Sequence, residues 1–188
     1  MKAKKILKLS FFGLSGAGKG TACTLASLYI RQKEPFAEFF YADVASPLHK
    51  IQQFIYSQFG LKNSGQDGKL LQFLAKNYQN ELQENISKRI DDFLKENEEA
   101  ECPLYVLNSD CRNNAYNVLK DKGFIFIKID TSLESLNIRR EKRGDISLAS
   151  LENQVEQICD IVPDYVVQNN STIEDFEKEI QKTIELIC

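Results

Sequence analysis

Residues Gly13 to Thr21 read GLSGAGKGT and hold four of the nine glycines in this chain of 188 residues. The run before them, ILKLSFF at residues 6–12, predicts a strand, and the residues after Thr21 have the period of a helix. Glycines let a loop turn successive N–H groups toward phosphate oxygens, and Lys19 adds a mobile positive charge. A glycine loop between a strand and a helix is typical of nucleotide phosphate binding. The residues predicted to bind the phosphates are Gly13, Ser15, Gly16, Ala17, Gly18, Lys19, Gly20 and Thr21.

Short apolar runs alternate with segments of helical period along the whole chain. Residues 68–100 contain no proline and place apolar side chains at three- and four-residue intervals, which predicts one or two amphipathic helices. The alternation favours parallel strands joined by right-handed crossovers. The sequence therefore predicts one α/β domain over residues 1–188, a three-layer sandwich with helices on both faces of a five-stranded parallel sheet. The predicted strands are residues 6–12, 36–42, 104–108, 124–130 and 164–169.

The composition is that of an ordinary globular protein, with 43% hydrophobic and 27% charged residues. A net charge of −3 gives no general attraction to nucleic acid or to anionic lipid. No apolar stretch is long enough to span a membrane, and the N-terminal run leads straight into the glycine loop, which indicates a first strand and not a signal peptide. The five scattered cysteines and the lone His49 form no metal-binding pattern, so we expect reduced thiols in a cytoplasmic protein. Both a monomer and a homodimer are compatible with these features.

The loop departs from the strict phosphate-loop pattern, because Gly20 separates Lys19 from the hydroxyl of Thr21. This GKGT ending resembles the adenylate kinase group of nucleoside monophosphate kinases, whose loops read GxPGxGKGT, with Ser15 at the place of the proline. The resemblance implies that Lys19 contacts the β- and γ-phosphates of ATP and that the backbone from Gly16 to Thr21 wraps the β-phosphate. It also implies that Thr21 lies near the Mg²⁺ ion. The implied cofactors are ATP and Mg²⁺.

Four later segments resemble the phage-type deoxynucleoside monophosphate kinases and, more distantly, the dephospho-CoA kinases. They are YADVASPL (41–48), KLLQFL (69–74), NSDCRNN (108–114) and VQNNS (167–171), and they occur in the order of that family. The resemblance implies a P-loop kinase that transfers a phosphoryl group from ATP to a phosphorylated small molecule, a nucleoside or deoxynucleoside monophosphate. The helical region at about 43–100 would then lie on the acceptor side.

Asp110 follows the predicted strand 104–108 and lies at the carboxyl end of the sheet, where ligands bind in open α/β folds. A carboxylate there can help Thr21 to hold Mg²⁺, partly through water, which makes Asp110 a candidate catalytic and metal-binding residue. The alternative is a cap of the next helix. Arg112 matches the arginine of the DxR pattern in the phage-type kinases, which implies that it binds the acceptor phosphate as a bidentate fork. A surface ion pair is the alternative.

Asp43 ends the second predicted strand at the same edge of the sheet and is a candidate for orienting the acceptor. Its alternative role is an N-cap of the helix that follows.

Three arginines fall within five positions at Arg139, Arg140 and Arg143. Phosphoryl transfer needs positive charge over the migrating group, and a mobile lid can bring it. We therefore expect a short lid at about residues 139–150, with Arg139 and Arg143 on one helix face as catalytic residues and Arg140 on the acceptor side. A solvated, basic helix end is the alternative.

Two other functions stay open at this point. In a kinase with an alcohol acceptor, such as dephospho-CoA, Asp43 would be the general base. A non-catalytic ATP-binding protein would keep the loop without transferring a phosphoryl group.

Overall fold

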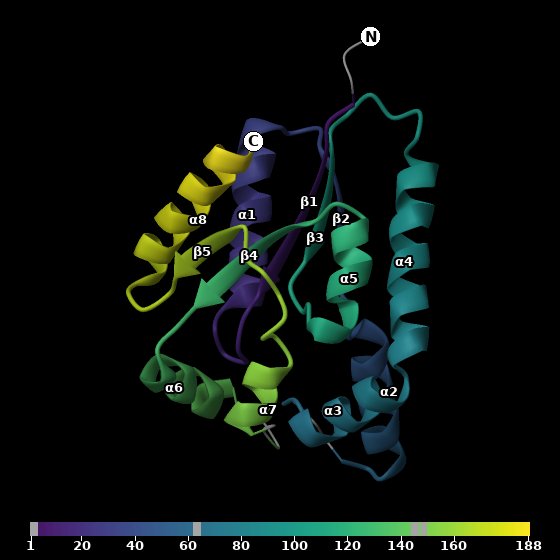
Figure 1. The fold of residues 1–188 in the computed structure, drawn as a ribbon, viewed down its shortest axis with the longest axis vertical. Helices are drawn as coiled ribbons and strands as arrows, with labels where there is room; N and C mark the ends of the chain where they lie inside the picture. Colours follow the sequence, from purple (N-terminus) through teal and green to yellow (C-terminus); the bar gives the residue numbers. More distant parts are fainter. Residues whose placement is uncertain (1–3, 62–64, 144–146, 148–149) are drawn as a thin grey trace.

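The computed structural model describes residues 4–61, 65–143, 147 and 150–188. Its sheet is parallel throughout, with the strand order β2-β3-β1-β4-β5 (Figure 1). All of the predicted strands are confirmed, each to within two residues. Their bounds are β1 (Ile6–Phe12), β2 (Glu38–Tyr41), β3 (Leu104–Asn108), β4 (Ile125–Asp130) and β5 (Tyr165–Gln168).

Helices cover both faces of this sheet, as the alternation of apolar runs predicts. One face packs against α1 (Lys19–Lys33) and α8 (Ile173–Ile187), and the other against α4 (Gln79–Glu96) and α5 (Asn113–Asp121) (Figure 1). Successive strand residues point to opposite faces, so Phe11 packs in the first layer and Phe12 in the second. The result is a three-layer sandwich in which the central strands are buried on both sides.

The remaining helices gather beyond the carboxyl ends of the strands (Figure 1). They are α2 (Ser46–Gln58), α3 (Gly68–Asn77), α6 (Leu133–Arg143) and α7 (Leu151–Glu156). β1 lies between β3 and β4, so the chain leaves it toward one side of the sheet first and toward the other side later. Such a switch point opens a crevice at the carboxyl edge. The glycine loop that follows β1 lies at this crevice.

A buried side chain ties three strand ends together at the same edge. Asn108, which is fully buried, accepts a hydrogen bond from the hydroxyl of Ser10 at 2.8 Å and donates one to the carbonyl of Ala42 at 2.7 Å. Its side-chain oxygen also accepts from the N–H of Cys111 at 3.0 Å. Buried polar groups with all partners present hold one arrangement firmly. The positions of the residues after β2 and β3 are therefore fixed relative to β1.

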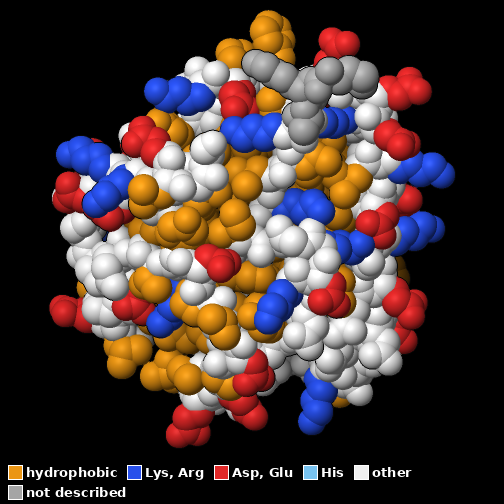
Figure 2. All heavy atoms as spheres, turned by 45° about the horizontal axis from the view of Figure 1, so that its top comes forward, with side chains coloured by type: hydrophobic (Ala, Val, Ile, Leu, Met, Phe, Trp, Pro, Cys, Tyr) orange, Lys and Arg blue, Asp and Glu red, His pale blue; other side chains and the backbone are white. Residues whose placement is uncertain are grey.

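The surface drawn in Figure 2 mixes acidic and basic side chains around bands of hydrophobic side chains. Both signs of charge are interspersed on this face. Among the helices of the described chain, none has both the length and the hydrophobicity that crossing a bilayer requires.

Candidate functional site

A cavity of about 1340 Å³ opens beyond the carboxyl ends of the strands. Its walls come from the glycine loop, the residues after β2 and β3, and the helices α2, α3, α6 and α7. Gly13, Ala17 and Arg140 are buried behind the wall, and the side chain of Arg143 lies outside the described residues. The predicted site residues that line the cavity are Ser15, Gly16, Gly18, Lys19, Gly20, Thr21, Asp43, Asp110, Arg112 and Arg139.

The glycine loop presents the N-terminus of α1 to this cavity. The helix begins at Lys19, after Gly18 in the left-handed region with φ 97°, and none of the described side chains caps this end. The ammonium of Lys19 donates to the carbonyl of Leu14 at 2.9 Å, which holds its charge over the loop. Thr21, in the first turn, is exposed toward the cavity. The positive end of a helix and a lysine beside it favour the binding of an anion.

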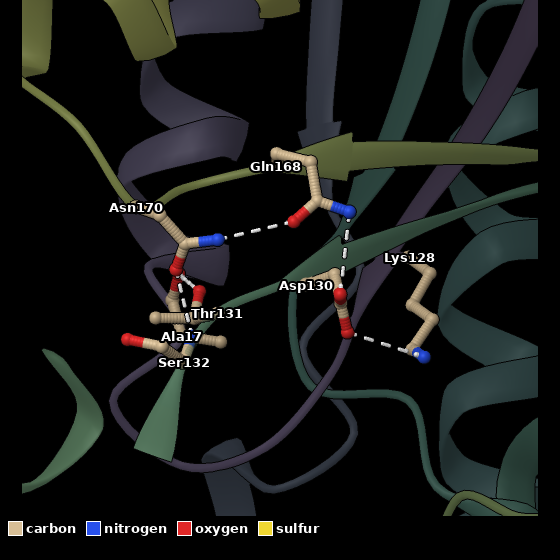
Figure 3. A network of polar contacts seen from close by, with 7 residues as sticks. All are labelled: Ala17, Lys128, Asp130, Thr131, Ser132, Gln168 and Asn170. Carbon is tan, nitrogen blue, oxygen red and sulfur yellow. Dashed lines mark hydrogen bonds and ion pairs between the residues drawn. The ribbon is translucent and has the colours of Figure 1, made fainter. Parts of the chain in front are cut away.

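The carbonyl of Ala17 is one point at which the back of the loop is held. It accepts hydrogen bonds from the side-chain amide of Asn169 at 2.7 Å, the hydroxyl of Thr131 at 3.2 Å and Arg139 at 3.5 Å. Figure 3 shows Thr131 beside Ala17. These donors follow β5, follow β4 and lie in α6, respectively. The loop is thus fixed from outside by three elements that come late in the chain.

Two glycines of the loop are required by this support. A Cβ on Gly18 would lie 2.4 Å from the side-chain nitrogen of Asn169, a distance at which atoms overlap. A Cβ on Gly16, with φ 86°, would lie 3.3 Å from the side chain of Arg140. Both positions also have the positive φ that glycine alone adopts at low cost. Glycine here serves the packing behind the loop as well as the approach of a phosphate in front.

A polar network joins the ends of β4 and β5, from which two of the loop supports come (Figure 3). Asp130 pairs with Lys128 at 3.3 Å and accepts from the side chain of Gln168 at 3.2 Å. Gln168 accepts from Asn170 at 3.1 Å, and Asn170 accepts from the N–H of Ser132 at 2.7 Å. These cross-strand contacts keep the two strand ends in register.

The arginine helix α6 lies against the loop. Arg139 donates to the carbonyl and the side-chain oxygen of Asn169 at 3.1 and 3.2 Å. Arg140, which is 8% exposed, donates through Nε to the carbonyl of Ser15 at 2.8 Å. The structure therefore places Arg140 against the glycine loop, at Ser15, and not on the predicted acceptor side. The alternative of a solvated helix end does not describe these two arginines.

The carboxylate of Asp110 is directed at backbone N–H groups. It accepts from Val44 at 2.9 Å and from Ala45 at 2.7 Å, and the side chain of Asn108 donates to it at 2.7 Å. Asp110 therefore does cap a helix start, but the helix is α2, across the sheet edge, and not α5, which follows it in the chain. A carboxylate has about four acceptor positions, so one remains for a water or a metal ligand.

Asp43 is the second carboxylate of the cavity, and its surroundings differ. The hydroxyl of Ser109 donates to it at 3.4 Å, and Ala45, not Asp43, occupies the N-cap position of α2. Burial and the nearby charge of Asp110 raise the pKa of Asp43, and the positive charges of Arg89 and His49 only partly oppose this. A carboxyl with a raised pKa that faces a cavity is a candidate for proton transfer.

Arg112 connects the loop to the residues after β3. Its guanidinium donates to the carbonyl of Gly13 at 2.9 Å and lines the cavity. Burial lowers its pKa, and the charge of Asp110 works in the opposite direction. This half-buried position, with a hydrogen bond to a main-chain carbonyl, does not fit the surface ion pair that was the alternative. After their predicted roles, we call the side of the cavity formed by the glycine loop the donor wall and the side formed by α2 and α3 the acceptor wall. The guanidinium of Arg112 lies where these two walls meet.

The acceptor wall, formed by α2, α3 and the described residues between them, is rich in polar side chains. Within the described lining no side chain is aromatic, and Leu48 and Leu71 supply apolar surface. Among the described residues that line the cavity, the Lys and Arg side chains are Lys19, Lys50, Lys76, Arg112 and Arg139, and the acidic side chains are Asp43, Asp110 and Glu156. Positive charge exceeds negative charge in the cavity although the whole chain carries −3. This local field favours anionic ligands.

A contact across the cavity joins the segment after α6 to the start of α3. The carbonyl of Ser147 accepts from the N–H of Gly68 at 3.0 Å, and its hydroxyl accepts from the N–H of Lys69 at 3.0 Å. The same hydroxyl donates to Asp67, which also accepts from Tyr56 at 2.6 Å. The predicted lid at 139–150 falls partly outside the described residues, but Ser147 within it reaches the acceptor wall.

Known proteins were compared with this chain in sequence and in fold. No family model and no curated protein matches the sequence. Solved structures match over nearly the whole chain. A sugar kinase from Janibacter sp. has a TM-score of 0.54 at 15% identity, over 98% of this chain and 94% of that chain. The APS kinase of Mycobacterium tuberculosis, in complex with AMPPNP and APS, has a TM-score of 0.54 at 17% identity, over 98% of both chains. The fold is that of the P-loop kinases.

A gluconokinase from Sinorhizobium meliloti shares this P-loop kinase fold with a TM-score of 0.52 at 14% identity, over 98% of this chain and 93% of that chain. At such identities the likeness concerns the fold. It does not single out the nucleoside monophosphate kinases among the P-loop kinases.

Several residues around the glycine loop could not be predicted from the sequence. Asn169 lies in a segment quoted for its resemblance, but nothing in the pattern indicates that its side chain reaches Ala17. Thr131 and Gln154 carry no motif at all. Their roles depend on which strand ends and helices lie together. The sequence signal that could have indicated them is the presence of polar residues directly after each strand.

Proposed function

We propose that this chain transfers the γ-phosphoryl group of ATP to the phosphate of a nucleoside or deoxynucleoside monophosphate. The observation that carries the proposal is one cavity that is lined by the glycine loop and also by Asp43 and Arg112, which follow β2 and β3. Donor and acceptor phosphates could meet there in line, with excess positive charge around them. The GKGT loop and the four family-like segments favour a mononucleotide as the acceptor.

Catalysis in this scheme is electrostatic. Lys19 would stabilise the charge that develops on the migrating group, with Arg139 at the rear of the loop. Arg112 would bind the acceptor phosphate beside the donor. The walls of α2 and α3, within the predicted acceptor region 43–100, would exclude water from the cavity.

The donor side fits a Mg²⁺ ion of the kind that accompanies ATP. Mg²⁺ in such sites takes one or two protein oxygens and completes its shell with phosphates and water. Thr21 offers a hydroxyl in the first turn of α1, and Asp110 keeps an acceptor position for a bridging water. The ion would neutralise phosphate charge.

A second candidate is an alcohol acceptor, as in dephospho-CoA or a sugar derivative. The raised pKa of Asp43 and its sparse hydrogen bonding favour it, because a general base must be able to take the hydroxyl proton. Two solved structures of this fold are named as a sugar kinase and a gluconokinase. A non-catalytic ATP-binding protein would explain the donor wall but not the charged groups on the acceptor side.

The test is turnover of ATP and Mg²⁺ with a panel of acceptors: all common mononucleotides, dephospho-CoA, gluconate and simple sugars. Our proposal predicts that a mononucleotide gives the highest kcat/KM and that the product contains a new phosphoanhydride. A phosphoester product from an alcohol would support the second candidate instead. ATP binding without stimulation by any acceptor would indicate the non-catalytic protein.

A further inference from the structure

The short helix α7 places one buried side chain, Gln154, behind the glycine loop. Gln154 is 3% exposed, and its side-chain oxygen accepts from the N–H of Ser15 at 3.1 Å and from Nη2 of Arg140 at 2.9 Å. Arg140 in turn donates through Nε to the carbonyl of Ser15 at 2.8 Å. Both backbone groups of Ser15 are therefore bound within one closed ring of three residues.

This ring connects three separate elements of the chain. Ser15 stands at the crest of the loop, Arg140 comes from α6, and Gln154 comes from α7. The close approach of α6 depends on Gly16, since a Cβ there would meet the side chain of Arg140 at 3.3 Å. One carboxamide oxygen thus accepts a hydrogen bond from the loop and another from the arginine helix.

We propose that Gln154 is a positioning residue of the donor site, which fixes the loop crest and the arginine helix relative to each other. The inference rests on the proposed function, in which the loop binds ATP and α6 brings positive charge to it. Gln154 acts through Ser15 and Arg140, so its loss should weaken donor binding and leave acceptor binding unchanged.

The chemistry of the ring predicts which substitutions are tolerated. Gln154→Leu keeps the approximate size but removes the oxygen, so a buried N–H of the loop loses its acceptor. Gln154→Glu keeps an oxygen for both donors and adds an ion pair with Arg140. Ser15→Pro removes the N–H but places a ring carbon where the oxygen of Gln154 now lies, so proline should be accepted only when Gln154 is shortened to Ala.

The experiment combines titration of a non-hydrolysable ATP analogue with steady-state kinetics. We expect Gln154→Leu to raise the Kd for the analogue and the KM for ATP about tenfold, with an unchanged acceptor KM. With Gln154→Glu, the Kd for the analogue and the KM for ATP should lie within about threefold of the parent values. Ser15→Pro/Gln154→Ala should bind the analogue more tightly than Ser15→Pro alone. Gln181→Leu in α8, where the amide bonds to Glu177 at 3.1 Å in its own helix, is the matched control.

Thermal unfolding without ligand gives a second, independent readout. If the ring exists, the variants Gln154→Leu and Arg140→Met should not be additive in their effect on Tm. Analogue binding by Gln154→Leu as tight as in the parent, or an additive pair, would overturn the inference while leaving the proposed function intact. A parent protein that binds no ATP would overturn the proposed function, and the donor role of Gln154 with it, even if the pair proved coupled.

Discussion

The two ends of the cavity are built in different ways. At the donor end, side chains from α6, from α7 and from the segments after β4 and β5 bind the backbone of the glycine loop, mostly from behind. At the acceptor end, α2 and α3 turn polar and charged side chains directly toward the cavity. Backbone held by buried contacts is preorganised and suits a ligand that never changes, whereas exposed side chains can be exchanged without rebuilding the fold. In the proposed reaction, the donor end would therefore carry the general function and the acceptor end would carry the specificity.

The largest effect is expected from the donor lysine. Lys19→Ala removes the one cation held over the loop by a hydrogen bond to Leu14, and the proposed reaction should slow by on the order of 10³-fold. The fold should persist, because Lys19 belongs to no core cluster. Turnover and thermal unfolding of the purified variant test this. If the variant were as active as the parent, the glycine loop would have no role in the proposed reaction.

Asp43→Asn should separate activity from stability. We expect turnover to fall about 10²-fold, by loss of an acceptor-side carboxylate. Because burial and Asp110 raise the pKa of Asp43, its ionised form costs folding free energy at every pH above its folded pKa. The variant should therefore have a higher Tm than the parent at neutral pH.

The Tm difference between Asp43→Asn and the parent should depend on pH in a defined direction. The gain in Tm should shrink as the pH falls through the folded pKa and vanish below the pKa of an unfolded aspartate, where both forms are neutral. Asp110→Asn is the contrasting control, since it weakens the hydrogen bonds to Val44 and Ala45 and should lower Tm. A lower Tm for Asp43→Asn as well would mean that both carboxylates are structural.

Arg112→Lys tests the boundary between the two ends. Lysine keeps the charge but loses the planar fork, so the acceptor KM should rise about tenfold while the KM for ATP changes little. The bond to the carbonyl of Gly13 could be kept by a lysine, which limits any effect on the loop. Steady-state kinetics with each substrate varied in turn decide the matter. A rise confined to the KM for ATP would assign Arg112 to the donor.

The smallest effect on activity is expected at Asp67, which lies on the acceptor side of the contact with Ser147. Burial opposes ionisation there, but the hydrogen bonds from Ser147 and Tyr56 outweigh it and lower the pKa of Asp67. Asp67→Asn should cost about 1 kcal/mol of stability at neutral pH and change turnover only a few-fold.

A carboxyl with a lowered pKa stabilises above its unfolded pKa, and this contribution is lost as the pH falls through its folded pKa. The difference between parent and Asp67→Asn in denaturant unfolding should therefore disappear in acid. A difference that persists below that range would show that the charge of Asp67 is not what matters.

The strands and the loop could be predicted because their signals are local. Apolar runs such as residues 104–108 are long enough for a buried strand, and the glycines of the loop are improbable in any other role. The break between α3 and α4 could not be placed, since it falls at Tyr78 without a glycine or a proline. Tertiary packing, not propensity, ends the helix there.

The site could be predicted only where a residue acts near its own place in the chain. Asp110 was expected at the carboxyl edge and lies there, but the helix it caps is set by the pairing of β2 with β3. Arg140 was assigned to the acceptor from helical spacing alone, and the position of α6 over the loop decides otherwise. The metal-binding, catalytic and acceptor roles of the named residues stay predictions.

The contact of Ser147 with Gly68 and Lys69 has a consequence for how the cavity opens. Those two N–H groups lie at the start of α3 and are bound by a residue from the other side of the cavity. Their exchange with deuterated solvent therefore requires the two sides to part. The exchange rates of the Gly68 and Lys69 amides should therefore report how often the cavity opens for substrates to enter and products to leave. Their exchange should slow when both substrates are bound.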